Sequence, residues 1–537
     1  MTRQQATRFL TQATFGPTAS DVNHLMSTGY AGWIDEQMAM PMNGLSHVAH
    51  WDAADARLLA VTDGQRASSG ETTGSFWRRA LSGQDQLRQR VAFALSEIFV
   101  VSMRDSCGDN AYSRGVADYL DMLGRQAFGS YRDLIESVAL HPVMGCYLSH
   151  MKNQPADSRT GRVPDENFAR ELMQLFSIGL YELQMDGTLR TDGSGAPVET
   201  YGPSDISGLA SVFTGWSWRC PQGLTSACFY SDPGMPVQYT GRMAAYSKYH
   251  STDEKVFLGT RIGASMWATP QGSLKAALDR ISAHPNVGPF LSKQLIQRLV
   301  TSNPSAAYVG RVSQAFVSSG SNLGAMVRAI LLDPEARDDS KVNSDQFGKV
   351  REPILRFTAL LRATGVHSDS GFYQLTNTTD EGQSLGQSPL SAPSVFNFFR
   401  PGFKSPGSQS ASVGLLTPEL QIANETTVAG YVNFMAGLVH HGVGRSGFDG
   451  KASRQDIQLD INTRDQHPWL ALADHPTELV NEIDQALMYG TMPVGLAQKI
   501  ADTLASIQGL DTLTTRRDRV RAALLLTVAS PDFEVQK

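Results

Sequence analysis

The stretch from Pro164 to Tyr181, PDENFARELMQLFSIGLY, predicts a helix with two different faces. At about 100° per residue, its apolar side chains fall on one broad arc and its polar side chains on the other. Pro164 and Asp165 suit a first helical turn, and Gly179 can end the helix. The polar face contains carboxylates, amides, a hydroxyl and a guanidinium but no lysine: Glu166, Asn167, Arg170, Glu171, Gln174 and Ser177.

Two interpretations of this polar face stay open. In the first, Arg170 bridges Glu166 and Glu171 in a buried hydrogen-bonded network or in the wall of a site. Replacing Arg170 with Ala would then cost about 3–5 kcal/mol, because unpaired charge would remain inside. In the second, Glu166 and Arg170 form an exposed i,i+4 pair that contributes little to stability.

Length and charge limit the fold and the partners. The chain has 537 residues, enough for two or more cores or for one large toroidal core. Its net charge of −6 provides no basic surface for nucleic acid. No apolar stretch reaches the roughly 18 residues that span a bilayer. We therefore expect neither a nucleic-acid partner nor a membrane span.

Amphipathic segments recur along most of the chain and predict a mainly α fold, for which an α/α toroid is one arrangement. We expect a main helical body over residues 1–365, with an insertion of loops and hairpins at about 184–270. Residues 366–537 are predicted to form a covering loop and C-terminal helices packed on that body. Within the insertion, the two Asp-Gly turns of MDGTLRTDGSGAPVETY predict a hairpin.

Four cysteines bear on the cellular compartment. Cys220 and Cys228 bracket a short loop, a reasonable span for a disulfide, and Cys107 and Cys146 would then be left as a second pair. Four free thiols are the alternative. Neither CxxC nor Cys/His zinc spacing occurs in the sequence.

The two turns of the predicted hairpin contain candidate metal ligands. Asp186 and Asp192, with nearby carbonyl groups, could hold a structural calcium ion. The spacing of an EF-hand loop is absent, and turn chemistry alone explains both residues. No other cofactor is expected.

Carboxylates are the leading candidates for catalysis, because the motifs of most serine hydrolases, nucleotide-binding enzymes and zinc peptidases are absent. Hydrolysis of a glycoside needs one protonated and one ionised carboxyl group. Glu166 and Glu171 are the predicted catalytic acids. They lie about 140° apart on a helix, so one of them would more readily pair with an acid elsewhere. The candidate second acids are Asp205, Asp253, Glu419 and Glu425.

Aromatic side chains near this segment suit substrate binding. Trp216, Trp218 and Tyr249 have flat faces that can stack on sugar rings, although packing in a core is the commoner role of such rings. Arg170 is the candidate cation for binding a charged group of the substrate.

A second constellation lies in KYHSTDEKVFLG. His250 held by Asp253 suits general-base catalysis, and Lys255 can stabilise an anion. The same residues would serve a lyase, in which His250 removes a proton while Lys255 or Arg170 binds the carboxylate of an acidic sugar. A loop held together by salt bridges is the structural alternative.

Six segments occur in the order RFLTQATFGPT, LRQRVAFALSEIFVVS, ENFARELMQLFSIG, TYGPSDISGLASVFTGW, YHSTDEKVFLG and SAPSVFNFFRPGF. Together they resemble the bacterial domain-of-unknown-function 1800 family, over nearly the whole chain. The resemblance implies a mostly helical, exported protein and supplies no catalytic residues. It also implies a phosphatase-like or sulfatase-like protein partner, since such proteins are often encoded beside family members. Met1 leads almost directly into a helix, without an export signal. Because proteins of the resembled family commonly begin with such a signal, the resemblance implies a secreted or periplasmic protein whose signal was removed.

The sequence therefore predicts an exported bacterial hydrolase that acts on a carbohydrate polymer by carboxylate acid/base chemistry. A polysaccharide lyase with a His/Lys/Arg site is one alternative. A non-enzymatic secreted binding or assembly partner of a phosphatase-like or sulfatase-like protein is the other. Convergence of Glu166, Arg170, Glu171, His250 and Asp253 on an open pocket would favour an enzyme, and scattered or fully paired side chains would favour a binding protein.

Overall fold

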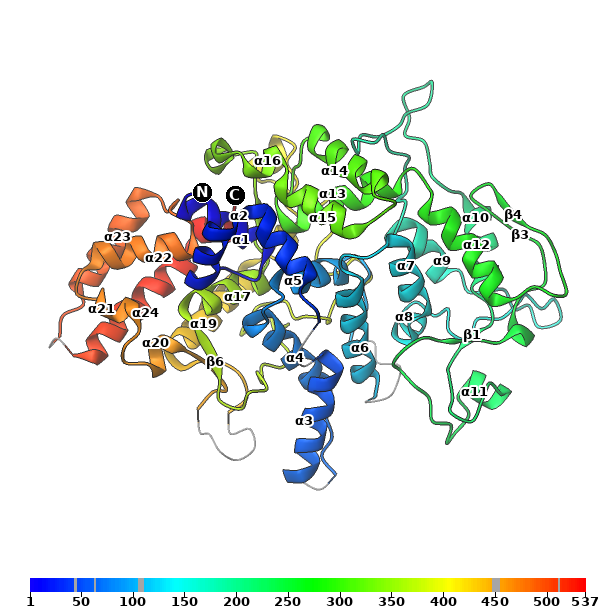
Figure 1. Ribbon diagram of the computed structural model, residues 1–537, viewed down its shortest axis with the longest axis horizontal. Coiled ribbons are helices and arrows are strands. Elements are labelled where there is room, and N and C mark those ends of the chain that lie inside the picture. Colours follow the sequence, from blue (N-terminus) through cyan, green and yellow to red (C-terminus); the bar gives the residue numbers. More distant parts are fainter. Residues whose placement is uncertain (43–45, 62–63, 105–110, 447–453, 510–511) are drawn as a thin grey trace. The chain divides into compact units, whose positions relative to one another are not determined.

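A computed structural model describes residues 1–42, 46–61, 64–104, 111–446, 454–509 and 512–537. Helices dominate these residues, and the named strands pair only in two-stranded antiparallel sheets (Figure 1). The predicted mainly α fold is confirmed. Among the described helices, none combines the length and the apolar character that crossing a membrane would require.

The chain forms two compact units, each built from separate stretches of sequence. Unit 1 comprises Met1–Phe93, Ile296–Pro304 and Leu331–Lys537, and unit 2 comprises Ala94–Leu295 and Ser305–Ile330. This division differs from the predicted boundary near residue 365, which lies inside unit 1. Both ends of the chain belong to unit 1. They are joined there by the side chains of Arg8 and Gln12, which both donate to the carbonyl of Lys537 at 3.1 Å.

Unit 1 contains most of the N-terminal and C-terminal helices. Its α-helices are α1 (Arg3–Ala13), α2 (Ala19–Ala39), α3 (His47–Val61), α4 (Ser69–Ser82), α16 (Pro334–Arg337), α17 (Pro353–Thr364), α18 (Gln409–Ser412), α19 (Glu425–His441), α20 (Asp460–Thr463), α21 (Pro468–Ala471), α22 (Pro476–Leu487), α23 (Val494–Ser506), α24 (Leu513–Val528) and α25 (Pro531–Glu534). Two 3-10 helices, η2 (Asp339–Asn343) and η3 (Pro418–Gln421), accompany strands β5 (Lys349–Val350), β6 (Val366–Ser368), β7 (Ile457–Leu459) and β8 (Val535–Gln536). β5 pairs with β8, and β6 pairs with β7.

The core of unit 1 lies between the first and the last helices of the chain. Leu360, Leu438, Leu479 and Leu524, from α17, α19, α22 and α24, are fully buried in one apolar cluster. α22, α23 and α24 pack against one another, as the orange and red helices in Figure 1. Gly16 packs so closely on α17 that a Cβ there would lie 2.5 Å from the Cα of Ala359, which only glycine avoids.

Unit 2 contains the helices and short strands of the middle of the chain. They are α6 (Ala111–Gln126), α7 (Tyr131–Leu140), α8 (Pro142–Tyr147), α9 (Asn167–Gln174), α10 (Pro203–Val212), α11 (Ser226–Tyr230), α12 (Pro270–Ser282), α14 (Ala306–Ser318), η1 (Ser247–Tyr249), β1 (Trp216–Ser217), β2 (Ala244–Ala245), β3 (Lys255–Phe257) and β4 (Thr260–Ile262). The division between the units falls within α5 (Gln86–Ser96), α13 (Val287–Leu299) and α15 (Leu323–Leu332). β1 pairs with β2, and β3 pairs with β4.

The helix predicted from Pro164 to Tyr181 is present but shorter. α9 ends at Gln174, after which the hydroxyl of Ser177 donates to the carbonyl of Leu172 and the amide of Gly179 donates to the carbonyl of Met173 at 2.9 Å. Gly179 has a φ of 71°, a conformation that glycine adopts without strain. These capping bonds compete with further helical turns and end α9 early.

The apolar side of α9 lies in the core of unit 2. The ring of Phe168 stacks on His150, with ring centroids 3.9 Å apart, and meets Phe213 of the segment after α10 edge-on at 4.7 Å. Leu172 and Met173 are fully buried. The predicted apolar arc therefore corresponds to the buried side of the helix.

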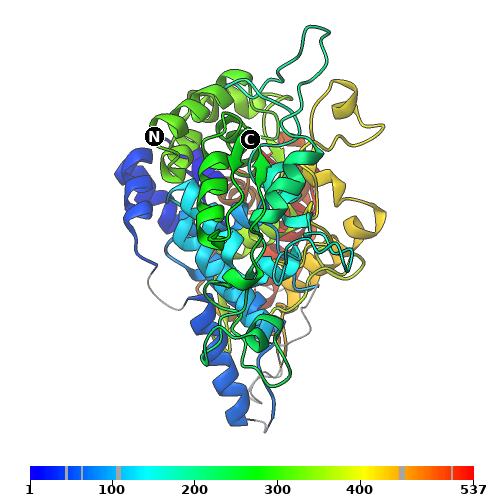
Figure 2. The same cartoon turned by 90° about the vertical axis from the view of Figure 1, so that its right-hand side faces the viewer.

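The predicted hairpin is also present. Antiparallel bridges join Tyr181 to Glu199, Leu183 to Leu189 and Thr191 to Pro197, which closes two successive turns. The segment extends as a long teal loop away from the helices of its unit in both ribbon views (Figures 1 and 2).

A disulfide joins Cys220 to Cys228, as the loop length suggested. Cys146 is also disulfide-bonded, and its predicted partner Cys107 lies outside the described residues. No described cysteine has a free thiol, so the alternative of four free thiols does not hold.

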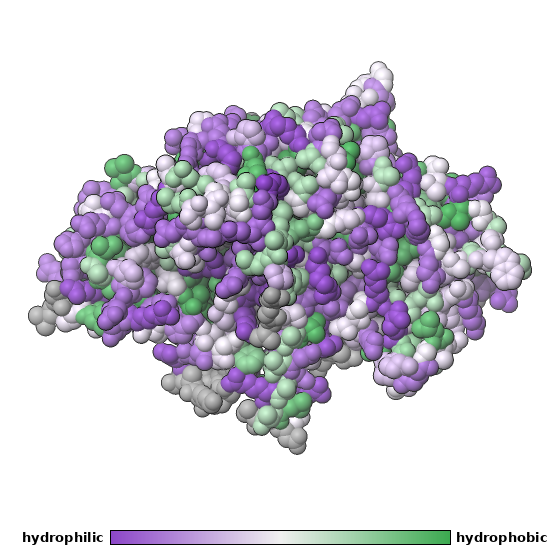
Figure 3. Space-filling view, in the orientation of Figure 1, coloured by the Kyte–Doolittle hydropathy of each residue, from purple (hydrophilic) through white to green (hydrophobic). Residues whose placement is uncertain are grey.

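Hydrophilic residues cover most of the face seen in Figure 3, and hydrophobic residues appear there in small separate patches. This distribution agrees with the burial of most large apolar side chains in the described residues.

Candidate functional site

Two of the segments noted in the sequence, around α10 and β3, pack tightly on each other in unit 2. Asp205 in the first turn of α10 accepts from the amide of Gly202 at 2.8 Å and from the amide of Leu258 at 2.7 Å. A Cβ at Gly208 would lie 1.8 Å from the carbonyl oxygen of Val256, so this contact requires glycine. Asp205 therefore holds two backbone segments together, and both of its carboxylate oxygens accept hydrogen bonds.

His250 lies in the interior beside this contact. Its Nδ1 is 2.8 Å from the carbonyl oxygen of Thr214, and its Nε2 is 2.9 Å from the hydroxyl of Ser273. A carbonyl only accepts, so Nδ1 carries the proton and Nε2 accepts from Ser273. Burial lowers the pKa of His250 to about 4, so the ring is neutral at pH 7 with both nitrogens occupied.

Lys255 and Asp253 do not extend this site into a catalytic triad. The ammonium group of Lys255 is buried and donates to the carbonyls of Ser251 at 2.7 Å and of Asp253 at 3.1 Å. Burial lowers the pKa of Lys255, while the nearby charge of Asp253 opposes that shift. The side chain of Asp253 is exposed, whereas the ring of His250 is turned to Thr214 and Ser273. The predicted pairing of His250 with Asp253 is therefore not formed.

The three aromatic residues predicted to stack on sugar have mainly packing contacts. Trp216 and Trp218 are each only 4% exposed. Trp218 meets the ring of Tyr239 edge-on, with centroids 4.8 Å apart. Tyr249 stacks on Phe229 at 3.9 Å and is only partly exposed. The predicted stacking role thus gains no support from their placement.

Glu166 and Arg170 form the exposed pair of the second interpretation. Their side chains are 43% and 45% exposed, and Nη2 of Arg170 lies 3.3 Å from Oε2 of Glu166. The buried network centred on Arg170 is not formed, because the N-terminal turn of α9 faces solvent. The large stabilisation expected of a buried Arg170 is thereby corrected to that of a surface pair.

Glu171, one residue further on, is buried. Its side chain is 8% exposed, and Oε2 has no hydrogen-bond partner among the described residues. Burial raises the pKa of Glu171, and the charge of Arg170 only partly opposes that shift. Such a carboxyl group holds a proton to higher pH than an ordinary glutamate.

Tyr201 lies near both Glu171 and Glu199. Burial raises the pKa of Tyr201, the negative charges of Glu171 and Glu199 raise it further, and the charge of Arg170 opposes them. The charges of Glu171, Arg170 and Glu199 thus all act on Tyr201, and we call Arg170, Glu171, Glu199 and Tyr201 the Glu171 face. Glu199 and Tyr201 are not among the residues predicted from the sequence, in which they occur only in the predicted hairpin and in the family-like segment TYGPSDISGLASVFTGW.

The remaining candidate acids lie elsewhere. Glu425 is exposed in the first turn of α19, and Glu419 is buried beside Lys349, both in unit 1.

The candidate calcium ligands serve as turn residues. The carboxylate of Asp186 accepts from the amide and the hydroxyl of Thr188, at 3.0 and 2.7 Å. Asp192 accepts from the amides of Ser194 and Ala196, at 2.8 and 3.0 Å. No group of three or more His, Cys, Asp or Glu residues suited to a metal ion occurs in the described part of the chain. The turn bonds account for the placement of both aspartates.

A family model described as "Protein of unknown function (DUF1800)" matches residues 8–535, which include the Glu171 face. No curated protein and no solved structure matches the chain.

Proposed function

Because this chain belongs to the DUF1800 family, whose description states no activity, we propose a function from the chemistry of the Glu171 face. The protein is an exported bacterial hydrolase that cleaves a carbohydrate polymer, and Glu171 is its general acid. One observation carries the proposal: a buried carboxyl group with a raised pKa and an oxygen free of protein partners among the described residues. Such a group keeps its proton in the resting protein, and because Oε2 is buried, neighbouring side chains move aside when a glycosidic oxygen binds.

The other residues of the Glu171 face complete the reaction. Glu199 is exposed and supplies the second carboxylate, which activates water or attacks the sugar. Arg170, oriented by its ion pair with Glu166, stabilises Glu171 once its proton has been transferred. The half-buried ring of Tyr201 offers an apolar edge beside the acids.

Export is supported by the cysteines. The disulfide between Cys220 and Cys228 persists in an oxidising compartment such as the bacterial periplasm or the extracellular medium. We therefore place the activity outside the cytoplasm as part of the same proposal.

The test is release of oligosaccharides from a panel of neutral and acidic polysaccharides. Glu171→Gln should lower release at least about 100-fold, the lower end of general-acid contributions, without lowering the melting temperature. Glu254→Gln is the matched control, because this exposed acid of unit 2 pairs only with Arg261 at the surface. No release by the parent from any polysaccharide, or equal release by Glu171→Gln, would overturn the proposal.

The lyase alternative has less support. His250 would have to give up its bonds to Thr214 and Ser273 before it could remove a proton from a substrate. In the same assay, unsaturated sugar products with ultraviolet absorbance would indicate a lyase and exclude the hydrolase.

A non-enzymatic binding role is the second candidate, and two observations favour it. The exposed Glu166–Arg170 pair, the buried Glu171, and His250 with its ring turned away from Asp253 do not form one common site.

Exposed apolar side chains are the other observation. Met266 and Trp267 lie side by side in the chain and are 78% and 82% exposed. Large apolar side chains in such a position are typical of an interaction surface. Sedimentation of the protein with a purified phosphatase-like or sulfatase-like partner tests this role. Trp267→Ser should weaken the complex at least tenfold, whereas no complex with the parent would exclude the role.

A further inference from the structure

Unit 1 contains a buried cluster of one lysine and two glutamates. The ammonium group of Lys349 lies 2.9 Å from Oε1 of Glu419 and donates to the carbonyl of Arg298, also at 2.9 Å. Oε2 of Glu352 accepts from the side-chain amide of Gln387 at 2.6 Å. Lys349, Glu352 and Glu419 are all buried. Among the described residues, Oε2 of Glu419 and Oε1 of Glu352 have no hydrogen-bond partner.

This cluster has one acid more than its lysine can neutralise. Arg356, a further cation of unit 1, forms an ion pair with Glu534 and lies over the ring of Tyr431, 4.2 Å from its centroid. Lys349 is the ion-pair partner of Glu419, and the negative charge of Glu352 also acts on Glu419. A further positive charge beside Glu419 would balance the cluster and satisfy an oxygen that lacks a partner.

A small cavity lies beside the side chain of Glu419. Its volume is about 30 Å³, enough for one group of the size of water or ammonium. Glu419 lines it together with Val350, Arg356, Leu420, Thr427 and Tyr431.

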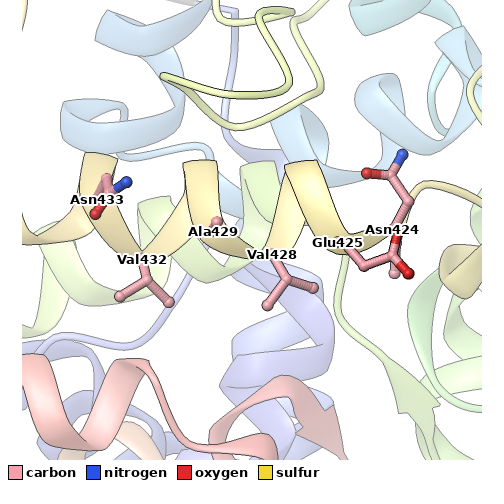
Figure 4. A pocket seen from close by; sticks show the side chains of 7 residues that line it. Asn424, Glu425, Val428, Ala429, Val432 and Asn433 are labelled. Atoms are coloured by element: carbon pink, nitrogen blue, oxygen red, sulfur yellow. The ribbon is translucent and has the colours of Figure 1, made fainter.

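An open groove runs along the exposed side of α19 next to the cavity. Its volume is about 590 Å³, and Ala429 and Val432 form part of its lining. Val428 and Val432 point to the same side of the helix, one turn apart (Figure 4). Ala423 and Val428 line both the groove and the cavity, and Val428 is 55% exposed. The groove and the cavity are thus adjacent and share two small apolar lining residues.

We propose that the groove and the cavity together bind a molecule with an apolar body and a primary ammonium end. The ammonium group occupies the cavity and donates to Oε2 of Glu419, which balances the charge of the cluster. The apolar body lies along Val428 and Val432 in the groove. This site is independent of the hydrolase proposed above.

The experiment is calorimetric titration of the whole chain with n-hexylamine, which is protonated at neutral pH. 1-Hexanol has the same body without the charge, hexanoate reverses the charge, and ammonium chloride lacks the body. We expect n-hexylamine to bind at least tenfold more tightly than each of the three. Equal binding of n-hexylamine and hexanol, equal binding of ammonium alone, or no binding of n-hexylamine would overturn the proposal.

Two variants locate the site. Glu419→Gln should weaken n-hexylamine at least tenfold and leave hexanol unchanged. Because Glu419 also pairs with Lys349 and its loss affects folding, Val428→Trp provides an independent variant that fills the groove from an exposed position. Val494→Trp is the control, since Val494 is an exposed valine of α23 outside the groove. Unchanged n-hexylamine binding by Val428→Trp would overturn the proposal.

Discussion

Glu419 in unit 1 and Glu171 in unit 2 are both buried glutamates, and burial raises the pKa of each. They differ in their partners. Glu419 lies 2.9 Å from the buried ammonium group of Lys349, whereas the cation nearest Glu171 in sequence, Arg170, is exposed and pairs with Glu166. In unit 1 the lysine offsets the cost of a buried charge, and in unit 2 protonation is the simpler way to reduce that cost.

The comparison shows that burial alone does not assign a role to an acid. A paired acid holds structure together, and removing its partner exposes the full cost of the buried charge. An acid without a protein partner is available for proton transfer or for a ligand. The following substitutions test whether this distinction holds, in order of decreasing expected effect.

Lys349→Met should have the largest effect on stability. It leaves Glu419 buried without its ion-pair partner, which should cost about 3–5 kcal/mol in the free energy of unfolding. Urea unfolding measures this loss, and Lys499→Met, at an exposed lysine of unit 1, is the control. A loss below about 1 kcal/mol would remove the distinction between the two acids.

His250→Ala tests a buried group of unit 2 whose partners are neutral. The carbonyl of Thr214 and the hydroxyl of Ser273 would lose their partners, at a cost of about 1–3 kcal/mol. The pKa of His250 is lowered to about 4, so between pH 6.5 and 4 the unfolded chain binds more protons than the folded one. The parent should therefore lose stability as pH falls through this window, and His250→Ala should show a smaller slope. Identical slopes for the two proteins would contradict the assignment.

Glu171→Gln should have a smaller effect, of opposite sign. The pKa of Glu171 is raised, so the folded chain binds the proton more tightly and the parent loses stability as pH rises above about 4.5. Gln has no charge to bury, so at pH 7 the variant should equal the parent or exceed it by about 1 kcal/mol. Thermal melts at pH 4 and pH 7 measure the difference. A variant less stable than the parent at pH 7 would show that Glu171 is paired and structural.

Arg170→Ala should have the smallest effect. Its exposed i,i+4 pair with Glu166 contributes a few tenths of a kcal/mol, which corresponds to a change of about 1 °C in melting temperature. A loss near 3 kcal/mol would instead support the buried network and would make Arg170 a buried, paired cation like Lys349.

Parts of the candidate site were predictable from local sequence. The amphipathic pattern identified α9 and its buried side, and the Asp-Gly turns identified the hairpin that contains Glu199. The boundary of α9 was not predictable, because the bonds of Ser177 and Gly179 that end the helix compete with equally local helical bonds. The same pattern placed Glu171 and Arg170 together on the polar side, although one is buried and the other exposed.

The sequence by itself determined the mainly α fold and the turns at Asp186 and Asp192, and it made the pairing of Cys220 with Cys228 one of two open alternatives. These features depend on helical periodicity, turn chemistry and short loops, which act between residues close together in the chain. Only the tertiary structure decided that Trp216 is a core residue and that Lys349 meets Glu419. Burial and ion pairing depend on which segments distant in sequence pack together, and that information is not contained in any local pattern.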